Sequence, residues 1–220
     1  MISILRQRTV KHLLQKLVKV KSSTLSSPKR SELYFGYGAN LSVKRFHDRK
    51  MNVQEVGNAV LRNHEIKFSL SNEYMNKGYA GVHEKEGSEV WGVLYEFDLL
   101  SIKLLDALEW CGFGAYERKK VKVCLTNGDE KYCWCYFVKS PKFDLVPSKI
   151  YLNNIIKAAQ ERKFPESYSD FLRDHEFKDN FKIDYGFSLL FYGKRRLFEH
   201  QLKSIYKTHD KLREKICDII

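Results

Sequence analysis

The hydrophobic positions of the chain predict five β-strands. Residues 33–37 form a short apolar run that ends at a glycine turn, a pattern typical of a buried strand. Apolar and polar residues alternate, as in half-buried strands, in four other stretches: residues 64–70, 89–97, 116–125 and 130–138. The last two stretches flank residues 126–129, whose Asn-Gly pair predicts a hairpin with a positive φ at its centre.

Apolar residues at helical spacing predict three helices. One covers residues 101–110, a second begins after Pro147 with Ser148 as its N-cap, and a long amphipathic helix covers residues 194–220. Strands with few intervening helices predict an α+β fold, which is either a small mixed, mostly antiparallel β-barrel or a highly curved sheet with flanking helices. The pattern does not choose between the two. The inward positions of the first two helices are Leu104, Leu105 and Leu108, then Ile155, Ile156 and Ala159.

The positive charge of the chain lies at its two ends. The formal net charge is +12, and residues 1–31 carry eight Lys or Arg and no acid. Residues 182–220 carry nine bases against five acids, so the central residues 32–181 have no net charge. We therefore expect no basic face on the central domain and no nucleic-acid partner. The charges divide the chain into an N-terminal arm (1–31), a folded domain (32–181) and a C-terminal extension that contains the amphipathic helix (182–220).

The N-terminal arm has two interpretations. Residues 1–31 are basic, rich in serine and free of acids, and we expect them to be disordered. The arm is either a solvated segment of a cytoplasmic protein or a mitochondrial transit peptide that directs the chain to the matrix. The chain contains no apolar run of about 18 residues, so no membrane partner is expected.

Cysteine and histidine residues form no recognisable catalytic or metal-binding motif. Five cysteines at irregular spacing do not predict a disulfide framework, and a reducing compartment is the default. Cys133 and Cys135 lie two apart on a predicted strand and are expected to be buried thiols, while Cys111 has no histidine at a telling spacing. No histidine pair, phosphate-binding loop or dinucleotide fingerprint is present, so we expect neither a metal nor a cofactor.

Two features are candidates for chemistry. The first is the turn after the first strand, Gly36-Tyr37-Gly38-Ala39-Asn40-Leu41, where glycines allow backbone N–H groups to approach an anion. The second is Glu109, which follows an apolar helix; burial there raises the pKa of a carboxyl group, as general acid–base catalysis near neutral pH requires. The alternatives are an ordinary strand-to-helix turn and an exposed glutamate at a helix end. Asp106 is expected to be a solvated surface carboxylate.

Five blocks of the chain, spread over residues 33 to about 172, resemble the γ-glutamylcyclotransferase family in the same order. The third block ends at Glu109, where the family has its catalytic glutamate. The blocks are Leu33-Tyr34-Phe35-Gly36-Tyr37-Gly38-Ala39-Asn40-Leu41; Gly81-Val82 with Glu89-Val90-Trp91-Gly92-Val93-Leu94-Tyr95; Leu105-Asp106-Ala107-Leu108-Glu109; Tyr116 with Val121-Lys122-Val123; and Pro147-Ser148 with Tyr151, Ile155 and Ala159.

The resemblance implies an intramolecular reaction in the central domain. In this family the α-amine of a γ-glutamyl group attacks its own γ-carbonyl, which releases 5-oxoproline and an amine or amino acid. Glu109 is implied as the catalytic acid and base, with no cofactor or metal, and a homodimer is implied on family grounds alone. The implied binding residues for the small γ-glutamyl substrate are the turn residues Tyr37, Gly38, Ala39, Asn40 and Leu41, then Tyr116 and, more weakly, Tyr136.

Three departures from the family pattern bear on the substrate. Ala39 stands where the family usually has serine, and Trp110 replaces a small residue after the catalytic glutamate, which would reshape the site. The two basic ends lie outside the resemblance. The turn resembles the branch that acts on γ-glutamyl amino acids more than the glutathione-specific branch, which has leucine at the position of Asn40. Cleavage of γ-glutamylamines and a non-catalytic ligand-binding role stay open as alternatives.

Overall fold

The computed structural model describes residues 31–49, 51–71 and 77–179. Five strands close into a barrel in the order β1-β3-β2-β4-β5. All neighbouring strands are antiparallel except β1 and β5, which run parallel and pair at Tyr34 and Trp134. The α+β prediction is confirmed, and barrel closure decides between the two predicted architectures. The strands are β1 (Ser31–Gly36), β2 (Val53–Ser71), β3 (Gly78–Asp98), β4 (Tyr116–Leu125) and β5 (Glu130–Val138).

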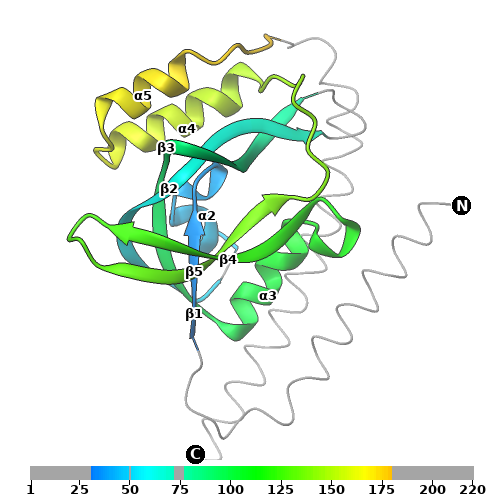
Figure 1. Cartoon of the computed structure of the whole chain (residues 1–220). Coiled ribbons are helices and arrows are strands. Elements are labelled where there is room, and N and C mark those ends of the chain that lie inside the picture. Colours follow the sequence, from blue (N-terminus) through cyan, green and yellow to red (C-terminus); the bar gives the residue numbers. More distant parts are fainter. Residues whose placement is uncertain (1–30, 50, 72–76, 180–220) are drawn as a thin grey trace, which may run out of the picture.

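In Figure 1, helices lie above and below the strands of the barrel. The helices α4 and α5 lie next to each other at the top, and α3 lies toward the bottom. A one-turn helix and two short 3-10 segments complete the described elements. The bounds are η2 (Ala39–Leu41), α2 (Lys44–His47), α3 (Leu99–Leu108), η3 (Cys111–Phe113), α4 (Lys149–Glu161) and α5 (Glu166–Arg173).

The predicted strands 116–125 and 130–138 are confirmed at both bounds, whereas β2 and β3 are far longer than predicted. The pairing of β2 with β3 shifts register three times, between Glu55 and Gly57, between Arg62 and His64, and between Phe68 and Leu70. One residue of β2 is left out of the pairing at each shift, and at the second shift residues 85–88 of β3 are left out as well, so the regular two-residue alternation is broken at these positions. The alternation that marks a strand is therefore interrupted along β2, and only its last part, from residue 64, was predicted.

Two of the three predicted helices are confirmed, and one of these is shifted in position. Asp98 caps α3, since its carboxylate accepts a hydrogen bond from the Ser101 N–H at 2.7 Å, so the helix begins two residues before residue 101. Ser148 caps α4 as predicted and accepts from the Tyr151 N–H at 3.3 Å. The short helices α2 and α5 were missed, because few turns leave little periodicity to detect. The predictions for residues 1–30 and 182–220 lie outside the described residues.

The interior of the barrel is aromatic, and it holds α2 against the strands. Phe46 of α2 is fully buried, with its ring edge-on to Tyr95 and to Phe97 at centroid distances of 5.1 Å. Tyr34 of β1 packs edge-on against Phe97 at 5.7 Å. At Gly92, a Cβ atom would lie 2.5 Å from the carbonyl oxygen of Gly36, so only glycine allows β3 to approach β1 this closely. This packing fixes the end of β1, where the candidate turn begins.

Candidate active site

The turn that follows β1 is closely packed. The Leu41 N–H donates to the Gly38 carbonyl at 3.1 Å and closes the turn. A Cβ atom at Gly36 would come within 2.9 Å of the Asn40 carbonyl oxygen, and one at Gly38 within 3.1 Å of Ala80 Cβ. Close approach therefore requires glycine at position 36 and leaves little room for a Cβ atom at Gly38, and the Leu41 amide is already used within the turn. The turn holds its side chains in defined positions.

Glu109 lies at the point where α3 ends. It is the C-cap residue of the helix, and the next residue, Trp110, adopts the left-handed conformation with φ of 55°. Oε1 of Glu109 accepts a hydrogen bond from Asn40 Nδ2 at 2.9 Å. The same amide nitrogen lies 2.9 Å from the Tyr34 hydroxyl. The structure thus brings the two candidate features of the sequence together.

The carboxyl group of Glu109 is buried although part of the residue is exposed. Burial raises its pKa, because the charged form loses hydration. The hydrogen bond from Asn40 and the charges of Arg45 and Arg49 oppose this rise, while the charge of Asp106 adds to it. The net pKa is above the ordinary value, which suits a group that accepts and returns a proton near neutral pH.

Four buried tyrosine hydroxyl groups are close enough to Glu109 to feel its charge. Burial raises the pKa of each hydroxyl, and the nearby Glu109 carboxylate adds to every one of these rises. The hydroxyls therefore stay protonated at neutral pH and can act as hydrogen-bond donors. The four residues are Tyr34 on β1, Tyr37 in the turn, Tyr116 on β4 and Tyr151 on α4.

Two of these hydroxyls donate to backbone carbonyls. Tyr37 donates to the Tyr136 carbonyl at 2.6 Å, and Tyr116 donates to the Ala80 carbonyl at 2.7 Å. Tyr151 differs, because its oxygen accepts from the Ala80 N–H at 3.3 Å, and that bond leaves its hydroxyl hydrogen for another acceptor. A Cβ atom at Gly38 would lie 3.5 Å from this oxygen. Tyr151 therefore joins the turn, β3 and the surroundings of Glu109.

The interpretation of Asp106 as a solvated surface carboxylate is wrong. Its Oδ1 accepts a hydrogen bond from the Tyr136 hydroxyl at 2.8 Å and lies 3.4 Å from Arg118 Nε. Partial burial raises the pKa of Asp106, and the bond from Tyr136 and the charge of Arg118 oppose that rise. The Tyr136 hydroxyl is thereby engaged by Asp106. Tyr136 is next to the site through its backbone, which accepts from Tyr37.

The cysteines behave as structural thiols. Cys133 and Cys135 are fully buried on one face of β5, as predicted. Cys111 is half-buried, and burial with the nearby Asp106 charge raises its pKa to about 12, so it carries no thiolate at neutral pH. Within residues 31–49, 51–71 and 77–179 the structure contains no cluster of His, Cys, Asp and Glu suited to a metal ion.

Three residues beside Glu109 were missed as site residues by sequence reasoning. Arg45 and Arg49 belong to α2 and the turn after it, and α2 has only four residues, too few to show a pattern. Tyr151 belongs to the fifth block of the family resemblance, but no role in the site was assigned to it. By contrast, Trp110 is 44% exposed and is among the exposed large apolar residues of the described chain. In the part of the chain that the structure describes, no helix has both the length and the apolar character to cross a membrane.

Comparisons with known proteins show which family this chain resembles in sequence and fold. Residues 89–172 match the model of the AIG2-like family. The gamma-glutamylcyclotransferase of Mus musculus is 31% identical over 147 residues, which cover 64% of this chain and 77% of the relative. The protein of the same name from Homo sapiens is 30% identical over 153 residues, 68% of this chain and 81% of the relative. A solved structure described as gamma-glutamyl cyclotransferase is 28% identical, with a TM-score of 0.64, over 69% of this chain and 92% of that one.

Proposed function

This chain belongs to the γ-glutamylcyclotransferase family, and from that premise we propose that it converts a γ-glutamyl amino acid into 5-oxoproline and a free amino acid. The observation that carries the proposal is the buried Glu109 carboxylate, hydrogen-bonded at 2.9 Å to Asn40 of the glycine turn. A base of raised pKa next to a turn of closely packed glycines suits a substrate that presents an ammonium group and a carboxylate together.

The proposed reaction forms one C–N bond and breaks another. Glu109 accepts a proton from the α-ammonium group of the substrate, and the resulting amine attacks the γ-carbonyl carbon. The tetrahedral intermediate then expels the nitrogen of the leaving amino acid. In total the α-nitrogen loses two protons and the leaving nitrogen gains two, with Glu109 carrying protons between them. Because both reacting groups belong to one molecule, the enzyme has mainly to hold the folded, near-attack conformation.

Charge stabilisation in this reaction is assigned to Tyr151. A tetrahedral intermediate places negative charge on the former carbonyl oxygen, and a preorganised O–H donor stabilises it. One contact supports this role for Tyr151: its oxygen accepts a hydrogen bond from the Ala80 N–H, which leaves the hydroxyl hydrogen for the substrate. The hydroxyls of Tyr37 and Tyr116 donate to carbonyl groups and hold the walls of the site.

The positive charges near Glu109 favour an amino acid as the leaving group. The charges of Arg45 and Arg49 lower the pKa of the Glu109 carboxyl group, so both arginines act on the site electrostatically. A γ-glutamyl amino acid carries a second carboxylate on its leaving group, next to the bond that breaks. A simple γ-glutamylamine lacks that carboxylate and would gain less from these charges.

The test is 5-oxoproline release from a γ-glutamyl amino acid, a γ-glutamylamine and glutathione. Wild type is expected to turn over the γ-glutamyl amino acid most efficiently. Glu109→Gln keeps the shape of the side chain and removes the base, so its rate is expected to fall by about 10²–10⁴-fold. The matched control is Glu86→Gln, because Glu86 is an exposed glutamate on β3. Folded wild type that releases 5-oxoproline from none of the three substrates would contradict the proposal.

A further inference from the structure

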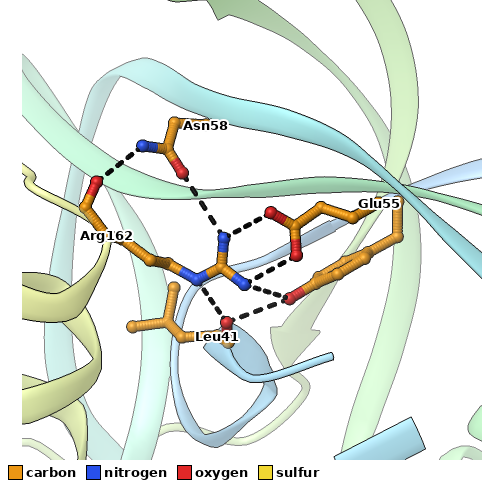
Figure 2. Close-up of polar contacts among 5 residues, drawn as sticks. Leu41, Glu55, Asn58 and Arg162 are labelled. Carbon is orange, nitrogen blue, oxygen red and sulfur yellow. Dashed lines mark hydrogen bonds and ion pairs between the residues drawn. The ribbon is translucent and has the colours of Figure 1, made fainter. Parts of the chain in front are cut away.

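The side chain of Arg162 reaches from the end of α4 to the candidate active-site turn. Its Nε donates to the Leu41 carbonyl, which also accepts from the Tyr95 hydroxyl at 3.0 Å. Figure 2 shows the guanidinium group between this carbonyl and the carboxylate of Glu55. One arginine thus connects α4, β2 and the turn. Leu41 lies next to Asn40 in the chain, and Asn40 holds Glu109.

The guanidinium group of Arg162 is held in one orientation. Its two terminal nitrogens each lie 2.8 Å from an oxygen of Glu55, the two-point geometry that arginine forms with a carboxylate. Hydrogen bonding from Arg162 lowers the pKa of Glu55, so this carboxylate stays charged. The Arg162 side chain is only 14% exposed, which reduces solvent competition for these bonds. Lysine could supply the charge but not the two-point contact.

The backbone of Arg162 is fixed as well. Arg162 is the C-cap of α4, and the helix ends in a Schellman motif with Lys163 in the left-handed conformation. The Phe164 N–H donates to Ala159 at 3.0 Å and the Lys163 N–H donates to Gln160 at 2.9 Å. Asn58 Nδ2 donates to the Arg162 carbonyl at 2.8 Å, also visible in Figure 2. The backbone of Arg162 is therefore held at the end of α4 and by Asn58, and its side chain is held by Glu55 of β2.

We propose that Arg162 is a positioning residue that sets the hydrogen bond between Asn40 and Glu109, with Glu55 and Asn58 as its supports. The turn is closed by the Leu41 N–H and packed at Gly36, so a displacement of the Leu41 carbonyl moves Asn40 with it. Arg162 acts on the base through two intervening residues and does not touch it. The inference rests on the proposed function only where it is tested by kinetics. The titration of Glu109 does not require that function.

Loss of the arginine has a specific expected consequence. Once the Asn40 amide moves away, Glu109 loses the hydrogen bond that lowers its pKa. A hydrogen bond donated to a carboxylate favours its charged form, so loss of this bond is expected to raise the pKa of Glu109 further. The other titratable and charged groups that face or influence Glu109 are Tyr34, Tyr37, Arg45, Arg49, Asp106, Cys111, Tyr116 and Tyr151.

The experiment compares three arginine variants in the full chain. Arg162→Gln removes the guanidinium group and with it the bonds to Glu55 and the Leu41 carbonyl. Arg162→Lys restores the charge and one hydrogen bond, and Arg173→Gln is the matched control. Arg173 also pairs with two carboxylates, Glu166 and Asp170, but on the exposed face of α5. One readout is the pH profile of kcat/KM for 5-oxoproline release. The second is the titration of the Glu109 carboxyl group by NMR on carboxyl-labelled protein, assigned with Glu109→Gln.

The expected result is specific to Arg162. Arg162→Gln should move the acid limb of kcat/KM and the NMR titration of Glu109 to higher pH, and Arg162→Lys should recover part of both. Arg173→Gln should leave both unchanged. If Arg162→Gln does not fold, Glu55→Gln releases the same guanidinium and is expected to shift the titration in the same direction.

Two outcomes would overturn the inference. One is a Glu109 titration in Arg162→Gln that coincides with wild type and with Arg173→Gln. The other is a lower thermal stability with an unchanged pH profile, which indicates a purely structural arginine. Because the NMR titration requires no turnover, it decides the inference even if wild type releases no 5-oxoproline. The absence of 5-oxoproline release by wild type would count against the proposed function alone.

Discussion

Asn40 donates a hydrogen bond through Nδ2 to Oε1 of Glu109 at 2.9 Å, although 69 positions separate the two residues. Asn40 is buried in the turn after β1, and Glu109 ends α3. The barrel brings them together because α3 follows β3, and residues 93–98 at the end of β3 pair with all of β1. This bond joins the substrate-binding candidate to the base candidate, and it is the first relationship to test.

Asn40→Asp should weaken the enzyme without a large change in side-chain shape. The substitution replaces the donor with a second carboxyl group about one hydrogen-bond length from Glu109. Two carboxylates this close do not both ionise easily, so the upper of the two pKa values rises. We expect the acid limb of kcat/KM to move to higher pH and kcat/KM at neutral pH to fall by about 10–100-fold.

The control for this prediction is Asn127→Asp in the β4–β5 hairpin. Asn127 also donates to a carboxylate, that of Asp129, at 3.3 Å, but it is exposed and remote from Glu109. Its pH profile should match wild type. An Asn40→Asp profile that also matches wild type would show that the bond does not influence the base.

Glu109→Gln should make the folded protein more stable at alkaline pH. The pKa of Glu109 is raised in the folded state, so folding favours the protonated carboxyl group. The stability that this group contributes is present below the usual glutamate pKa of about 4.3 and is lost as pH rises through the folded-state pKa. Glutamine avoids that loss, which amounts to about 1.4 kcal/mol for each unit of pKa shift.

Urea unfolding of wild type and Glu109→Gln at a series of pH values measures this effect. The two stabilities should converge near pH 4 and separate as pH rises, with the variant the more stable. The exposed control Glu86→Gln should follow wild type throughout. A difference that is constant with pH would show that Glu109 titrates alike in the folded and unfolded chains.

Tyr151→Phe should slow the chemical step more than it weakens substrate binding. The hydroxyl is assigned to the negative charge that develops in the transition state, so its loss lowers kcat. We expect kcat to fall by about 10–100-fold with a smaller change in KM. Tyr132→Phe is the control, because Tyr132 is 70% exposed. Equal kinetics for the two variants would remove Tyr151 from the proposed mechanism.

Lys163→Gly should stabilise the protein. Lys163 adopts a φ of 55° after α4, a conformation that costs a residue with a side chain about 1 kcal/mol relative to glycine. For a domain of this size the melting temperature should rise by about 2–4 °C. Lys157→Gly, at an exposed position within α4, should instead lower the stability by about 1 kcal/mol. The two changes in thermal unfolding are expected to have opposite signs.

Local pattern was sufficient for part of the fold. The strands β4 and β5, the Ser148 cap and the buried pair Cys133 and Cys135 were all predicted correctly. Each depends on neighbours within a few residues: alternation along a strand, or a side chain that bonds the N–H group three positions on. The hairpin was predicted as well, and its positive φ falls on Gly128.

The site was predicted less completely than the fold. Glu109 and Asn40 stood out because of a motif order that resembles a known family, while their hydrogen bond was not predicted. Asp106 was misread, because its burial comes from Tyr136 on a strand 30 positions away. Arg162 carried no signal at all. Its partners Glu55 and Leu41 lie 107 and 121 positions from it in the chain.

The sequence by itself determined the positions of β4 and β5, the start of α4, parts of the other strands and of α3, and that residues 33 to about 172 follow the order of the γ-glutamylcyclotransferase family. The tertiary structure alone decided that β1 pairs with β5 to close a barrel and that Asn40 reaches Glu109. It also decided that Arg162 bonds to Leu41, in the turn that contains Asn40. Local structure follows from interactions within one turn or one strand. Closure and site geometry depend on burial and hydrogen bonds between residues far apart in the chain, which exist only after the barrel forms.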